Sequence, residues 1–298
     1  MQPNFRNILA FSFARILIAL GFVKRAKQRA LKGEFILSIY FHSPGKKMFE
    51  SIIQWFLKNG FHFISAKDLD RIIKRETAFP KGAVLLTVDD GWLSNEENIV
   101  YVANKYKVPV TIFVSTGPVK NGIFWWSYIN KGRKEKLINH TKQYLKRIPN
   151  DERLEIIKSL PQNIYIKREA MTIEQVKRSA SSKYITIGAH TVTHPILTNC
   201  EDLESFNEIN KSKLELEHWL QKEVDTFAFP NGSFSKREVN YLERLNFRLG
   251  FATEEVYLTQ ERLFLKYQLP RFYIYENASF SENICRMTGV WIKIFAKN

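Results

Sequence analysis

The sequence predicts an α/β protein whose mostly parallel sheet curls into a barrel related to the (β/α)₈ architecture. From Glu34 onward, about seven or eight short β-rich runs alternate with polar, helix-like stretches. Polar groups able to do chemistry follow several of these runs, as at the carboxyl edge of a parallel sheet. An open doubly wound sheet is the main alternative, but no GxGxxG follows the first run, which disfavours its dinucleotide-binding version.

The expected strands are runs rich in β-branched and aromatic residues. They span residues 35–41, 61–64, 83–88, 109–115, 184–189, 226–229, 247–252 and 271–274. The expected helices between them include residues 48–60, 96–107, 203–223 and 236–246. In the third of these helices, apolar side chains approximate a stripe at helical spacing: Leu203, Phe206, Ile209, Leu214, Leu216 and Leu220.

Residues 127 to about 180 interrupt the alternation with polar, basic, helix-like sequence. We interpret this stretch as a helical insertion on one face of the barrel, because it contains none of the expected strands. The sequence therefore predicts one barrel domain over residues 34–298 that carries the insertion.

Residues 1–33 form a basic N-terminal segment with no acidic side chain and seven basic ones: Arg6, Arg15, Lys24, Arg25, Lys27, Arg29 and Lys32. Its apolar part, residues 8–23, is shorter than the roughly 20 residues of a spanning helix, and Arg15 lies in its middle. We expect an amphipathic helix on a membrane surface. The alternatives are a helix packed on the protein's own body and a true span or signal. The surface interpretation places the protein in the cytoplasm at the inner face of the membrane, ahead of a secreted or periplasmic location.

The net charge is +15 over 298 residues, and apolar and charged fractions of 45% and 25% are ordinary for a globular protein. No zinc-finger, RNA-recognition or basic-zipper pattern accompanies this charge, so no nucleic-acid partner is expected. An anionic membrane surface or an acidic glycan accounts for it at least as well. The two cysteines, Cys200 and Cys285, lie far apart, which argues against a disulfide scaffold. The sequence leaves the oligomeric state open.

Three of the expected strands end in groups suited to catalysis. The first is followed by Asp89 and Asp90, the second by His190 and His194, and the third by Pro230 and Asn231. Two adjacent buried carboxylates repel unless a cation intervenes. If one of these carboxylates binds a divalent metal together with His190 and His194, three protein ligands leave a fourth position open, as in catalytic zinc sites. The other carboxylate would then remain free as a base.

Three stretches resemble the motifs of the polysaccharide deacetylases, carbohydrate esterase family 4, also called the NodB-homology domain. They are "LLTVDDGW" at 85–92, "GAHTVTHP" at 188–195 and "FAFPNG" at 227–232, and the resemblance covers roughly residues 34–275. It implies a deformed (β/α)₇ TIM-like barrel and metal-dependent removal of N-acetyl groups from amino sugars of a polysaccharide or of a glycan- or lipid-linked precursor. It also implies that Asp89 is the general base and that Asp90, His190 and His194 hold the metal. Zn²⁺ is the expected ion, with Co²⁺ or Ni²⁺ as alternatives.

The third motif departs from the family pattern. Asn231 stands where the family has an aromatic residue, which preserves the backbone N–H expected to help hold the oxyanion. The usual arginine of this motif is absent, and Arg271 is a candidate to replace it beside Asp89. No late strand ending in histidine follows residue 275, but the strand at 35–41 ends in His42. This order resembles the permuted subgroup that includes poly-N-acetylglucosamine deacetylases, and it makes His42 the candidate general acid.

Trp125 and Trp126 follow the strand at 109–115 and suit stacking on sugar faces, with core packing as the alternative for at least one of them. Together with Asn231, Pro230 and Arg271 they are the expected substrate-binding residues. A deformylase or another hydrolase of carbon–nitrogen bonds acting on a lipid-linked sugar is the second interpretation. The third is a non-catalytic, membrane-associated glycan-binding protein.

Overall fold

The computed structural model describes residues 5–161 and 165–291. All eight expected strands are present, and every named strand pair is parallel. They are β1 (Leu37–Phe41), β2 (His62–Ile64), β3 (Ala83–Val88), β4 (Val110–Val114), β5 (Ile185–Ala189), β6 (Thr226–Ala228), β7 (Leu249–Phe251) and β8 (Phe272–Tyr273).

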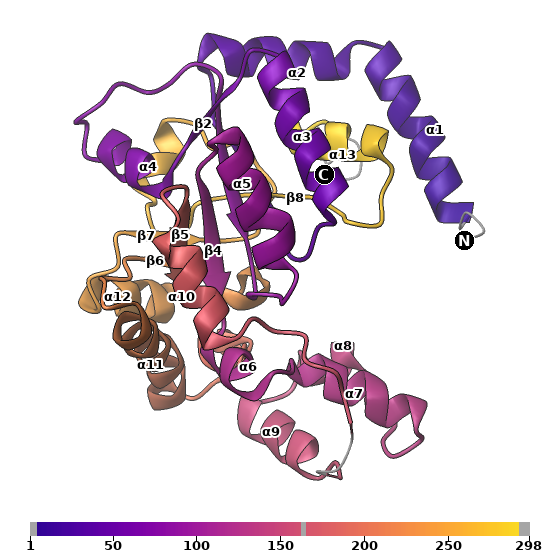
Figure 1. Cartoon of the computed structure of the whole chain (residues 1–298), viewed down its shortest axis with the longest axis vertical. Helices are drawn as coiled ribbons and strands as arrows, with labels where there is room; N and C mark the ends of the chain where they lie inside the picture. The colour runs from indigo at the N-terminus through magenta and orange to yellow at the C-terminus, as the bar shows by residue number, and fades with distance from the viewer. Residues whose placement is uncertain (1–4, 162–164, 292–298) are drawn as a thin grey trace.

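The strands follow the order β7-β6-β5-β4-β3-β1-β8, and β2 pairs with β3 off this path. A parallel bridge between Phe251 and Leu269 links β7 to the segment that leads into β8. Because β8 pairs with β1, this segment connects the two ends of the curled sheet (Figure 1). The expected deformed barrel is confirmed, with seven strands along the path and β2 as an additional short one.

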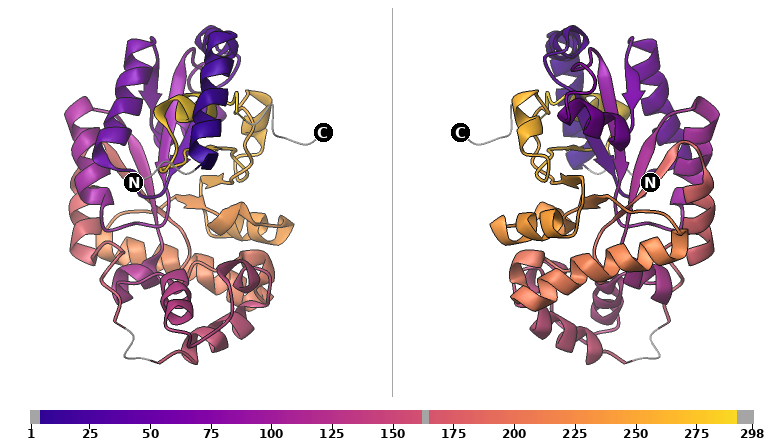
Figure 2. Two further views of the ribbon diagram at one scale, coloured as in Figure 1. Left: turned by 90° about the vertical axis from the view of Figure 1, so that its right-hand side faces the viewer. Right: turned by 90° about the vertical axis from the view of Figure 1, so that its left-hand side faces the viewer.

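Helices surround the sheet, as Figure 2 shows from two sides. Those of the barrel are α3 (Lys46–Lys58), α4 (Ala66–Ile73), α5 (Tyr101–Tyr106), α10 (Ile173–Ser181), α11 (Asp202–Leu220), α12 (Lys236–Arg244) and α13 (Phe280–Met287). A π-helical turn, Glu96–Val100, precedes α5, and short 3₁₀ turns cover Leu197–Asn199, Pro230–Gly232 and Glu261–Phe264. The strands present apolar residues to these helices and form the main core.

The expected stripe on α11 is only partly right. Leu203 and Leu214 are exposed, whereas Ile209 and Leu216 are buried. Polar side chains share the buried face, among them Glu208. Glu208 is buried there because its carboxylate accepts hydrogen bonds from the backbone of residues 192 and 193. These residues belong to the turn 190–194, which we call the histidine turn.

The helical insertion forms a lobe beside the barrel (Figure 1). The short helix α6 (Thr116–Asn121) leads from β4 to it, and the lobe holds α7 (Trp125–Lys134), α8 (Lys142–Leu145) and α9 (Asn150–Lys158). The lobe has a small apolar core of its own, formed by Trp125, Ile129, Leu145 and Leu160. Helix α10 packs against β5 as a barrel helix, so the insertion ends before it and not near residue 180.

The N-terminal segment forms two helices where one was expected. They are α1 (Phe5–Ala19) and α2 (Phe22–Lys32), and Gly21 between them adopts φ = 80°. Glycine takes this left-handed conformation without the steric cost of a Cβ. In the described part of the chain no single helix has the length and apolarity of a membrane span. The pair Arg6–Ala19 and Phe22–Lys32 meets that test jointly, with a bend of 61°.

One face of α1 packs on α13. Arg6 pairs with Glu282, and the ring of Phe13 meets Trp291 edge to face at 5.9 Å. On this face, α1 is therefore a helix packed on the protein's own body, which was one of the alternatives expected from the sequence. The outward side of α1 exposes the apolar side chains Ile8, Leu9, Phe11 and Ile16 together with Ser12 and Arg15, and Leu20 is exposed just after the helix ends.

Candidate active site

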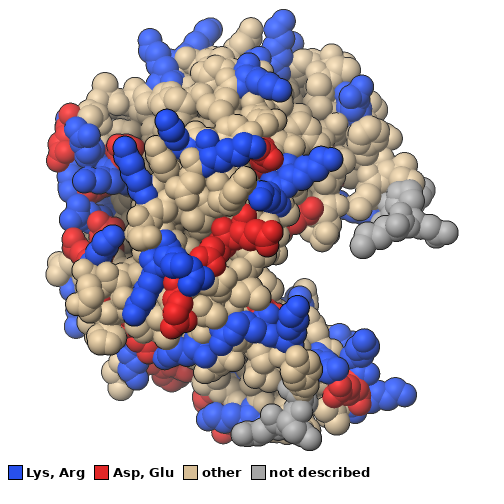
Figure 3. Space-filling model, viewed as in Figure 1, with Lys and Arg blue, Asp and Glu red and all other residues tan. Residues whose placement is uncertain are grey.

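The carboxyl ends of the strands surround a pocket of about 480 Å³ between the barrel and the helical lobe. Figure 3 shows the molecule hollowed between these two parts. The pocket is lined by Tyr40, His42, Asp89, Asp90, Trp92, Trp126, Lys142, Lys146, His190, His194, Asn231, Thr253, Tyr273 and Glu276. Seven of the expected site residues are therefore brought together: His42, Asp89, Asp90, Trp126, His190, His194 and Asn231.

The strand ladders place these side chains. The Asp89 N–H donates to the Phe41 carbonyl at 2.9 Å, which fixes the end of β3 beside the end of β1. The His190 N–H donates to the Val114 carbonyl at 3.1 Å, which fixes the end of β5 beside that of β4. Because parallel strands end at the same edge, residues about 100 positions apart meet there.

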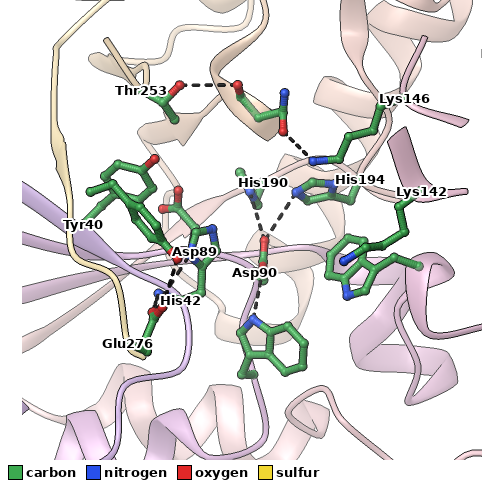
Figure 4. Close-up of a pocket in the computed structure, with 14 residues that line it drawn as sticks. Tyr40, His42, Asp89, Asp90, Lys142, Lys146, His190, His194, Thr253 and Glu276 are labelled. Atoms are coloured by element: carbon green, nitrogen blue, oxygen red, sulfur yellow. Dashed lines mark hydrogen bonds and ion pairs between the residues drawn. The ribbon is translucent and has the colours of Figure 1, made fainter. Parts of the chain in front are cut away.

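Asp90, His190 and His194 form a buried cluster (Figure 4). One carboxylate oxygen, Oδ1 of Asp90, lies 3.4 Å from Nε2 of His190 and 3.3 Å from Nε2 of His194. The second oxygen, Oδ2, accepts a hydrogen bond from Nε1 of Trp92 at 2.9 Å. One ligand atom from each of the three residues lies within 4.8 Å of the others. This set of two imidazole nitrogens and a carboxylate oxygen fits a divalent metal of the zinc type.

The protonation of this cluster also suits a metal. Nδ1 of His190 lies 2.7 Å from the Ala228 carbonyl, which can only accept, so Nδ1 carries the proton and Nε2 of the neutral ring is free to ligate. Burial lowers the pKa of His194, which favours the neutral imidazole. Burial works against the charge of Asp90, whereas protons on the facing nitrogens of His190 and His194, the positions that a metal would take, hold the pKa of this carboxyl well below its ordinary value.

Four residues of the site have left-handed backbone conformations: Asp90 (φ 76°), Thr191 (φ 65°), His194 (φ 55°) and Asn231 (φ 57°). Such conformations cost about 1–3 kcal/mol in residues other than glycine and cluster at functional sites. Gly91, next to Asp90, has φ 81°, and a Cβ there would lie 3.2 Å from Cγ1 of Val114. The "DDG" turn therefore packs against β4 and turns Asp90 into the pocket.

Asp89 is paired with Arg271 inside the barrel. Nη1 and Nη2 of Arg271 donate to Oδ1 and Oδ2 of Asp89 at 2.7 and 2.8 Å. Nη1 also donates to Oγ1 of Thr87, and Nε donates to the Ala252 carbonyl. The guanidinium lies 4.5 Å from the ring centre of Tyr40 and is fully buried. Arg271 thus lies beside Asp89, as expected, and it directly precedes β8.

His42 follows β1 on the side of the pocket opposite His194 (Figure 4). Its Nδ1 lies 4.0 Å from Oε1 of Glu276, which also accepts its backbone N–H at 2.8 Å. The ring of Tyr273 meets it edge to face at 5.4 Å. A partly exposed imidazole beside a carboxylate, facing the pocket, is suited to proton transfer. The role of general acid stays a prediction.

Three of the expected substrate contacts lie behind the pocket wall. Arg271 and Pro230 are buried and do not line the pocket, because one fills the barrel interior and the other closes the turn before Asn231. Trp125 belongs to the core of the lobe, and its Nε1 donates to the His194 carbonyl at 3.1 Å. It therefore supports the histidine turn, whereas Trp126 lines the pocket with its ring centre 4.9 Å from that of His194.

Two residues that were not predicted from the sequence stabilise the histidine turn through hydrogen bonds to its backbone. Oε2 of Glu208 accepts the N–H groups of Val192 and Thr193, both at 2.8 Å. Nη1 of Arg153, on α9 of the lobe, donates to the His194 carbonyl at 3.1 Å, and its guanidinium lies 4.9 Å from the Trp125 ring centre. The lobe therefore contributes directly to the position of a candidate metal ligand.

Comparison with known proteins identifies the family and relatives of the fold. A family profile for polysaccharide deacetylase matches residues 76–250, a range that excludes β1 and His42. The chain is 24% identical over 271 residues to the poly-β-1,6-N-acetyl-D-glucosamine N-deacetylase of Staphylococcus aureus (strain MSSA476), across 88% of this chain and 81% of that protein. It is 21% identical over 209 residues to YxkH of Bacillus subtilis (strain 168), a polysaccharide deacetylase by name. That match covers 70% of this chain, which spans 58% of the length of YxkH.

The fold is also that of a solved relative. The structure of IcaB from Ammonifex degensii superposes with a TM-score of 0.63 at 16% identity, covering 86% of this chain and 97% of that one. This likeness concerns the fold, and it extends over more of the chain than the profile match. Because the profile match covers more than half of the chain, this protein belongs to the polysaccharide deacetylase family, hydrolases that act on carbon–nitrogen bonds.

Proposed function

We propose that this protein removes N-acetyl groups from amino sugars of a polysaccharide or of a glycan- or lipid-linked precursor, using a divalent metal. One observation carries the proposal: the Asp90, His190 and His194 donor atoms converge in a pocket that a second carboxylate, Asp89, also lines. The relative that bears the name of a poly-N-acetylglucosamine N-deacetylase supports this substrate class. Zn²⁺ suits the donor set best, with Co²⁺ or Ni²⁺ as alternatives.

When bound, a divalent ion would supply Lewis acidity toward the acetyl carbonyl and lower the pKa of water at the site. Asp89 accepts the proton of the attacking water, because each of its oxygens keeps a second lone pair beside the bond to Arg271. The Asn231 backbone N–H is the proposed donor to the developing oxyanion. His42, which lies beside Glu276, gives a proton to the departing sugar amine.

The reaction is tested with the purified full-length chain, zinc and oligosaccharides of β-1,6-linked N-acetylglucosamine. We expect acetate release, a loss of 42 mass units per sugar, and inactivation by a chelator that zinc reverses. A loss of 28 units from a formylated sugar, without any acetate, would instead favour the deformylase. Zinc binding with neither product would leave the third interpretation, a non-catalytic glycan-binding protein.

We propose further that the outer face of α1 lies on an anionic membrane surface. The support is an exposed apolar face on a segment that carries seven basic and no acidic side chains over residues 1–33. Apolar burial and attraction to anionic lipid act together in such helices. This contact would bring the pocket near a lipid-linked saccharide, and the inner face of the membrane is the location we favour.

A further inference from the structure

The helical lobe contributes two lysines to the catalytic pocket. Lys142 begins α8 and Lys146 directly follows its last residue, so the two lie one helical turn apart on the same face. Both line the pocket. They lie on the His194 side of it, opposite His42 and Glu276 (Figure 4). Basic side chains also follow much of the lobe's edge of the hollow in Figure 3.

In the described part of the chain, no carboxylate forms an ion pair with either of these two ammonium groups. Within residues 5–161 and 165–291, neither lysine has a carboxylate oxygen within 4.0 Å. Nζ of Lys146 donates instead to the neutral Oδ1 of Asn231 at 2.6 Å. Burial and the charge of Lys142 lower the pKa of Lys146, against the smaller opposing effect of the Asp90 charge. The lobe therefore holds two like charges one turn apart, a repulsive arrangement, at the mouth of the site.

The carboxylates that line the same pocket have other partners. Asp89 is paired with Arg271, and Asp90 faces the two histidines of the metal cluster. Glu276 accepts the backbone N–H of His42 on the far side. The two lysines can therefore pair with an anionic group that enters the pocket with the substrate.

We propose that Lys142 and Lys146 form a subsite for an anionic group, phosphate or carboxylate, carried by the substrate next to the N-acetylated sugar. The inference rests on the proposed deacetylation and narrows its substrate class. Lysine binds phosphate and carboxylate oxygens as a point charge with three donors, which suits either group. Lys146 also joins the lobe to the Asn231 turn, so an anion at this subsite would contact both parts of the molecule.

The test compares matched probes on the zinc-loaded full-length protein. The phosphate pair is N-acetylglucosamine 1-phosphate and methyl N-acetylglucosaminide. The carboxylate pair is a hyaluronan tetrasaccharide and chitotetraose. Binding by calorimetry and acetate release are measured for wild type and for the Lys142→Gln/Lys146→Gln double variant. Lys158→Gln, an exposed lysine on α9 of the same lobe, is the control.

We expect an anionic probe to bind at least tenfold more tightly than its neutral partner. The double variant should remove this preference by weakening the anionic probes more than the neutral ones, whereas Lys158→Gln should keep it. Preference within one pair only would identify phosphate or carboxylate as the recognised group. Equal binding within both pairs, or an equal loss for neutral and anionic probes in the double variant, overturns the subsite. A lysine-dependent preference leaves the subsite standing even if no acetate is released, and the proposed reaction is refuted when the β-1,6-linked oligosaccharides also release none.

Discussion

Arg271 and Asp89 form a bidentate ion pair inside the barrel, and both side chains are almost completely buried. Removing one partner of a buried pair leaves an uncompensated charge, which costs about 3–5 kcal/mol. We therefore expect Arg271→Gln to lower the free energy of unfolding by about 3–5 kcal/mol and to slow acetate release. Urea denaturation and an acetate assay measure the two effects.

Arg262→Gln is the matched control for this substitution. Arg262 pairs with Glu254 at the surface, where an ion pair contributes about 0–1 kcal/mol. A similar loss of stability in both variants would contradict the structural role assigned to the buried pair.

At the residue scale, the sequence was most informative where a chemical pattern is contiguous. Asp89, Asp90, His190 and His194 could be predicted because each follows a buried strand. The support of the histidine turn could not, because Glu208 lies on a helix whose side-chain pattern gives no sign of a bond to residues 192 and 193. Only the packing of α11 against β5 brings that carboxylate to the turn.

At the element scale, α9 links the helical lobe to the metal cluster through Arg153, which donates to the His194 carbonyl. We expect Arg153→Gln to weaken zinc binding about tenfold, since groups that orient a ligand typically affect metal affinity by 10–100-fold. A zinc titration against a competing chelator measures this change. Far-ultraviolet circular dichroism should be unaltered. Arg133→Gln, an exposed position on α7, is the control, and equal affinities in all three proteins would refute the link.

The elements themselves were predicted unevenly. The strands were identifiable because buried β-branched runs alternate with polar helices. The end of the insertion was misplaced because α10 is as polar in sequence as the lobe, and only its contact with β5 assigns it to the barrel. The N-terminal helix was expected to be continuous because its apolar run passes through Gly21, where the chain in fact bends.

At the scale of the whole molecule, the exposed face of α1 is the proposed membrane contact. Ile16 on this helix and Leu20 just after it are exposed, so Ile16→Glu/Leu20→Glu should reduce sedimentation with anionic phospholipid vesicles without unfolding the barrel. Leu203→Glu/Leu214→Glu, two exposed positions on α11, is the matched control and should sediment like wild type. Equal sedimentation of both variants would argue against α1 as the contact.

The arrangement of the lobe against the barrel could not be predicted from the sequence. The pattern at 127–180 indicated helices, but nothing in it indicated that Lys142, Lys146 and Arg153 would meet the strand ends. These contacts arise from the tertiary packing of a segment with a small core of its own. The catalytic pocket is therefore formed by the barrel and the helical lobe together, and the sequence motifs identify only the barrel residues.

The central claim is that the two adjacent carboxylates have different tasks, and Asp89→Asn tests it most directly. Zinc content and acetate release are measured on the same purified sample, so that retained zinc also reports an intact site. We predict about one zinc per chain, held by Asp90, His190 and His194, and acetate release reduced by a factor on the order of 10²–10⁴. Near-normal turnover, or loss of zinc together with activity, would contradict the division of labour between Asp89 and Asp90.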